Sequence, residues 1–252
     1  MTRVHPTAVV APDARLGEGV VVGPYAVIEE GVEIGPGTVI GPHVVIHSGV
    51  RIGAKNRIHA HAVIGDQPQD LSYDGAPTRV EIGDENVIRE GVTIHRATRP
   101  DRPTRVGSRC FLMAYSHVGH DCQVGDDVIL TNGVLLGGHV VIEDRAVLGG
   151  GVGVHQFARV GRLAMVGALV KVTQDVLPFM LVEGKPARHY RLNTVGLRRA
   201  GVNGERYRAL EQAFRALRAG KGLNGVPLTP EVAHLKAFLE APTKRGITGF
   251  VR

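Results

Sequence analysis

Aliphatic residues recur at every sixth position over most of this sequence, and this period limits the possible fold more than any other feature. The series covers residues 4–64, resumes over 82–94, and runs from 106 to 172 with Val, Ile or Leu at every step. Two positions before each aliphatic residue lies a small or slender side chain, such as Ala26 or Ser116. An offset of two places both side chains on one side of a strand, whereas a helix with period 3.6 cannot produce this pattern.

Strands this short bury little alone, so successive turns must stack to form a narrow, continuous core. A content of 4% aromatic residues, with no Trp and with 34 Gly, suits such a thin interior. We therefore predict a mainly β fold, in which residues 1–188 form a hexapeptide-repeat solenoid (a parallel β-helix) and residues 189–252 form a small α-helical C-terminal domain. Gly directly follows many of the aliphatic positions, which we attribute to the backbone angles of sharp corners.

The repeat is interrupted twice, and its end is followed by helical spacing. Residues 66–80 and 96–105 carry Pro, Gly and charge where aliphatic residues are due, which predicts loop excursions. Two helices are expected in the tail, one with Asn203 as a possible cap and one with Thr229 as cap and Pro230 in the first turn. Their predicted buried faces consist of Tyr207, Leu210, Phe214 and Leu217 in the first helix and Val232, Leu235 and Phe238 in the second.

Five histidines between residues 95 and 155 are predicted to share a single edge of the solenoid. If each excursion replaces a single turn of the coil, steps of three strands align Ile64, Ile94, Val118, Leu136 and Val154. The histidines beside these residues are His95, His117, His120, His139 and His155. Coils about 4.8 Å apart extend this edge over roughly 20 Å, which suits a nucleotide sugar or an acyl chain better than one metal ion. The pair His117 and His120 also lacks the ligand spacing of β-helical zinc enzymes, so no metal is predicted.

Charge and apolar content limit the partners and the location. A net charge of +6 and a pI near 9.6 point to an acidic partner. No basic tail or aromatic–basic interleaving of the kind that binds nucleic acid is present. No segment approaches the ~18 apolar residues of a membrane span, and the N-terminus lacks a signal-peptide pattern, which predicts a cytoplasmic protein without membrane insertion. Cys110 and Cys122 are interpreted as small core residues.

Several longer motifs go beyond the repeat. They are QPQDLSYDGAPTRVEIGDENVIREGVTIHRAT, HVGHDCQVG, LLGGHVVIED, GGGVGVHQF and RLNTVGLRR, in this order. Over essentially the whole chain they resemble the acyl-carrier-protein–UDP-N-acetylglucosamine O-acyltransferases of lipid A biosynthesis. The resemblance implies transfer of a 3-hydroxyacyl group from acyl carrier protein to the sugar 3-hydroxyl of UDP-N-acetylglucosamine, in a homotrimer with active sites between subunits and without a cofactor. The left-handed sense of the β-helix is likewise taken from resemblance to hexapeptide-repeat proteins.

The same resemblance implies roles for individual residues. His120 matches the general base, Asp121 the group that orients it, and Gly138 the backbone N–H donor to the oxyanion. Ala168 matches the residue that limits acyl length, and its methyl group predicts a preference for medium-length chains. The positions that match substrate contacts are Asp70, His95, His117, His139, His155, Gln156, Asn193 and Arg199, of which the last two belong to the nucleotide side.

The chain departs from the family pattern at three positions on the nucleotide side. Many members carry Lys, Glu and Arg where this chain has Ser72, Val195 and Ala200, which predicts weaker nucleotide binding or a variant sugar. Two alternatives to the main reading stay open at the level of sequence. One is a hexapeptide acyltransferase that uses coenzyme A thioesters, and the other is a β-helical scaffold without catalytic activity.

Overall fold

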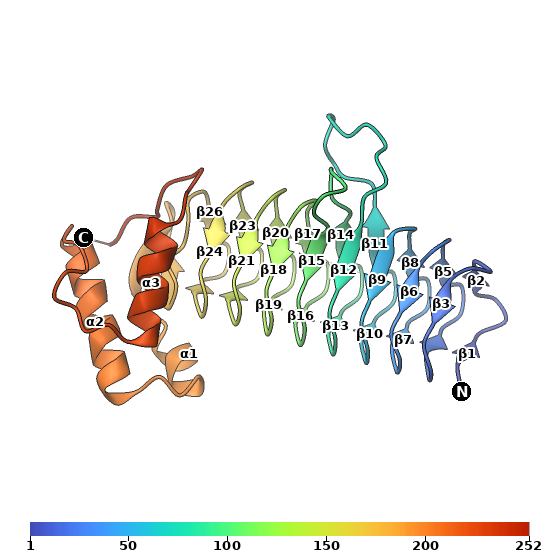
Figure 1. Cartoon of the computed structure of the whole chain (residues 1–252), viewed down its shortest axis with the longest axis horizontal. Helices are drawn as coiled ribbons and strands as arrows, with labels where there is room; N and C mark the ends of the chain where they lie inside the picture. Colours follow the sequence, from blue (N-terminus) through green and yellow to red (C-terminus); the bar gives the residue numbers. More distant parts are fainter. Residues whose placement is uncertain (252) are drawn as a thin grey trace.

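The computed structural model describes residues 1–251 as a long three-sided parallel β-helix with helices at its C-terminal end (Figure 1). Each side of the prism is one sheet, and along the solenoid each strand pairs with the strand three further on. We call the sheets A, B and C. The predicted β-helix is therefore confirmed.

Sheet A has eleven strands and continues into a hairpin at the C-terminal end. Its strands are β1 (Arg3–Val4), β4 (Val21–Val22), β7 (Val39–Ile40), β10 (Arg57–Ile58), β13 (Val87–Ile88), β16 (Phe111–Leu112), β19 (Ile129–Leu130), β22 (Val147–Leu148), β25 (Met165–Val166), β27 (Met180–Glu183) and β28 (Arg188–Leu192). The last two form an antiparallel hairpin that no repeat signal had predicted.

Sheets B and C complete the prism. Sheet B consists of β2 (Val9–Val10), β5 (Val27–Ile28), β8 (Val45–Ile46), β11 (Val63–Asp66), β14 (Thr93–His95), β17 (His117–Val118), β20 (Leu135–Leu136), β23 (Gly153–Val154) and β26 (Lys171–Val172). Sheet C consists of β3 (Arg15–Leu16), β6 (Glu33–Ile34), β9 (Val50–Ile52), β12 (Val80–Ile82), β15 (Thr104–Val106), β18 (Gln123–Val124), β21 (Val141–Ile142) and β24 (Arg159–Val160).

The interior is one continuous column of the predicted aliphatic and small residues. From Val20 onward both members of each hexad are buried, as are Cys110 and Cys122, which are free thiols. In the first coil Val4 is exposed and Val10 only partly buried. The reason is that no coil stacks on the open N-terminal end, so its inward side chains meet fewer neighbours.

The explanation offered for the Gly residues after the aliphatic positions was wrong. Apart from Gly65, these Gly residues do not adopt a left-handed φ. A Cβ at Gly35 would lie 2.6 Å from the Gly53 carbonyl oxygen in the next coil, so it is the close approach of stacked coils that requires Gly here. The left-handed corner falls two residues later, at positions such as Asp121 and His139, each with φ of 60°.

Both excursions leave the prism on the same side, at the corner between sheets B and C (Figure 1). The strands extend further into them than predicted, because Asp66 and Val80 still belong to β11 and β12, and β15 begins at Thr104. The loops proper are the first excursion, residues 67–79, and the second excursion, residues 96–103. Ladder pairing of Asp66 with His95 and of Val80 with Thr104 accounts for this difference.

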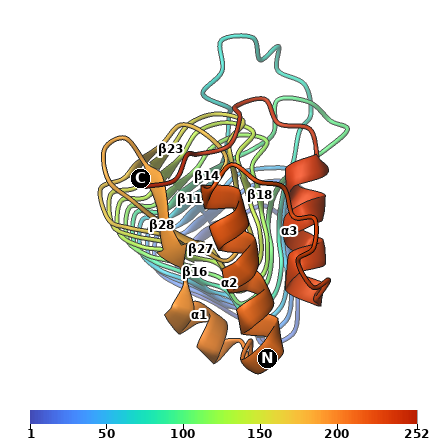
Figure 2. The ribbon, with the colours of Figure 1, turned by 90° about the vertical axis from the view of Figure 1, so that its left-hand side faces the viewer.

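Three helices close the C-terminal end: α1 (Thr194–Arg199), α2 (Gly204–Arg218) and α3 (Pro230–Glu240). Figure 2 shows them in front of the last coils of the solenoid. Thr229 caps α3 as predicted, with its hydroxyl accepting from the Val232 N–H at 3.3 Å, whereas the Asn203 side chain makes no capping hydrogen bond. The predicted core positions are buried, except Tyr207 and Leu217, which are only partly covered. No helix within residues 1–251 combines the length and the apolar character needed to cross a membrane.

Candidate active site

The predicted alignment of the histidine-bearing turns is confirmed by the register of sheet B. Ile64 pairs with Ile94, and Ile94 with Val118. Val118 in turn pairs with Leu136, and Leu136 with Val154. Because the inward residues are in register, the turns that follow them stack at one corner of the prism.

A groove of about 760 Å³ runs across the outer face of sheet B beside this corner. It brings together the predicted residues His95, His117, His120, Gly138, His155 and Gln156. Sequence reasoning missed the lining residues Gln69, Thr93, Tyr115, Leu135 and Lys171. Three of these, Thr93, Leu135 and Lys171, immediately precede an aliphatic position of sheet B, so the period alone could have placed them on this outer face.

His120 is the least exposed of the groove histidines, and it alone among them is paired with a carboxylate. Its Nδ1 lies 2.7 Å from Asp121 Oδ2, and its Nε2 lies 3.9 Å from Asp70 Oδ2, contributed by the first excursion. The ring rests directly against the Cα of Gly138, because a Cβ there would overlap the ring atoms Cε1 and Nε2. The hydrogen bond to Asp121 occupies Nδ1 of His120, so that Nε2 is the ring nitrogen that faces the groove.

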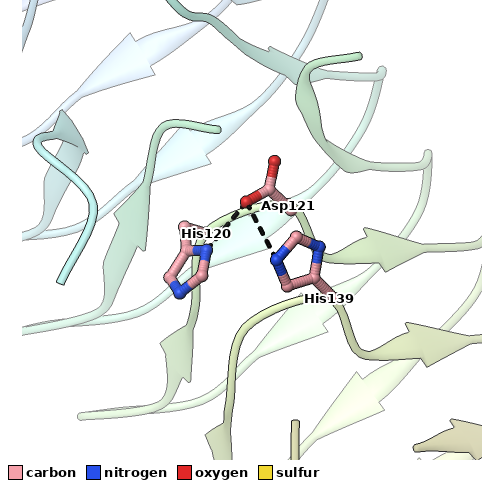
Figure 3. A group of neighbouring side chains, drawn as sticks. All are labelled: His120, Asp121 and His139. Carbon is pink, nitrogen blue, oxygen red and sulfur yellow. Dashed lines mark hydrogen bonds and ion pairs between the residues drawn. The ribbon is translucent and has the colours of Figure 1, made fainter. Parts of the chain in front are cut away.

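Asp121 is held by more partners than His120 alone (Figure 3). His139 Nε2 lies 3.6 Å from Asp121 Oδ2, and Thr98 in the second excursion donates to the carboxylate from its N–H and, at 2.8 Å, from its hydroxyl. The Asp121 N–H donates to the Thr104 hydroxyl at 2.8 Å. Burial acts to raise the pKa of Asp121, but the hydrogen bonds from His120 and Thr98 outweigh it and hold the pKa below its ordinary value.

The neighbouring histidines form two further contacts. His95 and His117 pack edge to face with ring centroids 5.0 Å apart, and the Thr93 hydroxyl lies 2.7 Å from His117 Nδ1. Burial lowers the pKa of His117 to about 4 and also lowers that of His95, so both rings are neutral near pH 7. His155 is exposed, with Nδ1 3.1 Å from the Gln156 carbonyl oxygen.

His139 lies next to the groove, and Asp121 links it to the groove residue His120. Its ring stacks on Phe157, with centroids 4.6 Å apart and an interplanar angle of 10°. Burial lowers the pKa of His139, although Asp121 acts in the opposite direction. Asp70 stands on the other side of His120, and hydrogen bonds from the Ser72 hydroxyl and N–H keep its pKa low.

Asp70, Asp121 and His139 border the groove through their contacts with His120 and with one another, whereas three other predicted residues lie apart from it. Asn193 is buried as the cap of α1, accepting from the Gly196 N–H and donating to the Leu163 carbonyl oxygen at 2.9 Å. Arg199 is exposed near the end of α1, and Ala168 is exposed in the turn between β25 and β26. Within one chain these residues are separate from His120, so their assigned roles stay predictions.

Among residues 1–251, His120, Asp121 and His139 bring their nitrogen and oxygen atoms within 4.8 Å of one another. This spacing alone is compatible with a metal ion. The contacts fit a hydrogen-bonded array better, because Asp121 Oδ2 accepts from His120 at 2.7 Å and from the Thr98 hydroxyl at 2.8 Å, both ordinary hydrogen-bond lengths.

Comparisons with known protein families agree with this architecture. Residues 175–248 match the family model described as UDP N-acetylglucosamine O-acyltransferase, domain 2. Residues 31–66 and 103–138 match the bacterial transferase hexapeptide repeat.

Curated proteins and solved structures extend the likeness over the whole chain. A protein of Alkalilimnicola ehrlichii named acyl-(acyl-carrier-protein)–UDP-N-acetylglucosamine O-acyltransferase is 55% identical over 98% of this chain and 99% of its own. One of the same name from Thiobacillus denitrificans is 50% identical over 92% of each. The UDP-N-acetylglucosamine acyltransferase structure from Campylobacter jejuni superposes with a TM-score of 0.92 at 36% identity, covering 99% of this chain and 100% of that one. The Francisella novicida structure reaches 0.89 at 35% identity, covering 99% and 94%.

Proposed function

The chain belongs to the family of acyl-(acyl-carrier-protein)–UDP-N-acetylglucosamine O-acyltransferases, and we propose on this premise how its groove carries the reaction. The protein is an acyltransferase that moves an acyl group from acyl carrier protein to UDP-N-acetylglucosamine. We propose a 3-hydroxyacyl group as the donor and the sugar 3-hydroxyl as the acceptor, in the first step of lipid A biosynthesis. The observation that carries the mechanism is the enclosed His120 ring between Asp121 and Gly138.

His120 acts as the general base. Asp121 accepts a hydrogen bond from the Nδ1–H of His120, so the lone pair on Nε2 faces the groove and takes the proton of the attacking hydroxyl. The imidazolium that forms lies between two carboxylates, Asp121 at 2.7 Å and Asp70 at 3.9 Å. Both carboxylates have lowered pKa values and stay charged, so they stabilise the positive ring.

The Gly138 backbone N–H stabilises the negative oxygen of the tetrahedral intermediate. Within residues 1–251 no group accepts a hydrogen bond from this N–H, and Gly138 is buried directly against the base. A donor fixed beside the base can bind the thioester oxygen as its charge develops. No other residue fits at 138, because any side chain would displace His120.

The step balances without an external reactant. The sugar oxygen forms a C–O bond to the thioester carbonyl carbon while its proton passes to His120 Nε2. Collapse of the tetrahedral intermediate breaks the C–S bond, and the imidazolium returns the proton to the departing sulfur of the carrier's prosthetic group. His120 is then neutral and ready for the next turnover.

Substrate contacts are proposed to come from two subunits. We propose that Asp70, His95, His117, His139, His155 and Gln156 contact the sugar and the acyl thioester. Asn193 and Arg199 would contact the nucleotide from a neighbouring subunit of a homotrimer, since within one chain they lie away from the groove. Light scattering of the purified protein tests the trimer, and a monomer that retains full activity would contradict it. The cytoplasmic location remains a prediction.

The acyl chain is proposed to end near Ala168. Replacing Ala168 with Gly removes one methyl group and should shift the preferred acyl length toward longer chains. Turnover across a series of 3-hydroxyacyl carrier proteins measures the shift, and an unchanged profile would exclude this role.

The proposed function is tested by product mass spectrometry. Purified protein is mixed with UDP-N-acetylglucosamine and a panel of 3-hydroxyacyl carrier proteins, with the matching coenzyme A thioesters in parallel. We expect one O-acylated sugar nucleotide from the carrier-protein donors, and its loss in His120→Ala but not in the control His5→Ala, which alters an exposed histidine of the first coil. Product from coenzyme A donors alone, or full activity of His120→Ala, would overturn the proposal.

A further inference from the structure

The C-terminal segment, residues 241–251, returns from α3 to the last coil of the solenoid (Figure 2). Backbone hydrogen bonds join Asp175 N–H to the Gly246 carbonyl at 2.8 Å and Thr248 N–H to the Asp175 carbonyl at 2.9 Å. The Arg245 guanidinium donates to the Thr173 carbonyl at 3.1 Å. These contacts place the adjacent residue, Lys244, beside the corner of the prism at which the active-site turns stack.

Lys244 ends a chain of contacts that begins at the base. Its Nζ lies 4.2 Å from the centroid of the Phe157 ring, and Phe157 stacks on His139 with centroids 4.6 Å apart. His139 Nε2 lies 3.6 Å from Asp121 Oδ2, the oxygen bonded to His120. Asp121, His139 and Phe157 occupy the left-handed corner of three consecutive coils, which is why their side chains stack.

This chain of contacts affects whether Asp121 pairs with His120 or with His139. A protonated His139 would pair with Asp121 and compete with His120 for the same oxygen. The charged and titratable groups that face His139 are Asp121 and His120 from the turn after β17, Asp70 from the first excursion, and Lys244 from the tail. Of these, Lys244 and His120 lower the pKa of His139, in addition to burial, which is the largest cause, whereas Asp121 and Asp70 raise it.

We propose that Lys244 is a positioning residue for the acyl transfer: by packing on Phe157 it keeps the His139 ring stacked and neutral, so that Asp121 is reserved for His120. The inference rests on the proposed function of His120. A cation over an aromatic face is attracted by the ring quadrupole, and stacked rings resist rotation of either partner. The C-terminal segment thus supports the base through Phe157, His139 and Asp121.

The experiment measures kcat and KM as functions of pH around neutrality for four variants. Lys244→Met keeps the length of the side chain without its charge, Lys244→Arg keeps the cation, and Phe157→Leu removes the ring between the two. The control Lys236→Met alters an exposed lysine of α3 that is paired with Glu240. We expect Lys244→Met to lower kcat about two- to fivefold, the equivalent of one exposed cation–π contact, with KM unchanged.

The pH profile separates positioning from packing. Without the Lys244 charge the pKa of His139 rises, so the acidic limb of kcat should move to higher pH in Lys244→Met and return in Lys244→Arg. Identical profiles of the Met and Arg variants, a wild-type kcat in Lys244→Met, or a change in KM alone would overturn the inference. Failure of the proposed function would be seen separately. It would show as an inactive wild-type protein or as an active His120→Ala variant.

Discussion

Replacing Gly138 with Ala tests the geometry of the site most directly. The added Cβ would fall 3.0 Å from His120 Nδ1 and closer still to Cε1 and Nε2, well inside contact distance. Carbon atoms pack at about 3.5–4.0 Å, so the ring must move by roughly 1 Å. The ring cannot move without cost, because it is only 4% exposed and its Nδ1 is bonded to Asp121.

A misplacement of this size costs about 10²-fold in the rate of a positioned reaction. We therefore expect kcat of Gly138→Ala to fall about 10²-fold, since the new methyl group displaces His120, the proposed base. The KM for UDP-N-acetylglucosamine should change little, because the other groove residues are untouched. Initial rates from quantified acylated product, at saturating donor, measure both constants.

A matched control separates this effect from a general loss of folding. Gly222→Ala places the same methyl group in open space outside the site, and should leave kcat unchanged. Thermal unfolding of both variants shows whether Gly138→Ala is folded at the assay temperature. A folded Gly138→Ala protein with wild-type kcat would refute the placement of His120 as the base.

Two further predictions concern hydrogen bonds to charged or titrating groups. Thr98→Val removes the hydroxyl donor to Asp121 and should lower kcat about tenfold, the scale of one hydrogen bond to a charged group, while Thr98→Ser should retain activity; equal rates for Val and Ser would contradict this. His189 is buried, accepts from the Leu177 N–H at 2.9 Å, and has its pKa lowered to about 4 by burial. As pH falls from about 6.5 toward 4 the unfolded chain takes up the proton first, so His189 alone should lower the free energy of unfolding by about 2 kcal/mol at pH 5. Urea unfolding at pH 7 and pH 5 measures the total loss, to which His117 contributes by the same mechanism. The loss should be about 2 kcal/mol smaller in His189→Gln, and an equal loss in that variant would exclude His189 as a source.

The solenoid and its histidine ridge followed from the period of the sequence because each coil can bury its aliphatic residues in only one register. Once Ile94, Val118 and Leu136 are stacked, the turns after them have no freedom to lie elsewhere. The antiparallel β27–β28 hairpin and the α1 helix were missed because they follow no repeat. The role of Gly was misread because the sequence shows where Gly recurs but not how closely the next coil approaches.

The supporting contacts of the site were beyond sequence reasoning for a similar reason. Thr98 lies in an excursion, where no period indicates which way a side chain points. Lys244 comes from a segment more than 80 residues away from Phe157 in the chain, and only the path of the tail brings the two together. Asn193 and Arg199 lie outside the groove of one chain, so their role depends on how copies of the chain assemble.

Parallel stacking also makes length along this molecule discrete. Residues 18 positions apart, such as His139 and Phe157, are neighbours along the axis, separated by one step of about 4.8 Å. Inserting three hexads between His120 and Ala168 would therefore lengthen that span by one such step, close to the reach of roughly four methylene groups, while the contacts inside each original coil stay the same. On the proposed role of Ala168, we expect the preferred acyl length to change coarsely when a coil is added or deleted and finely when a single methyl group is changed.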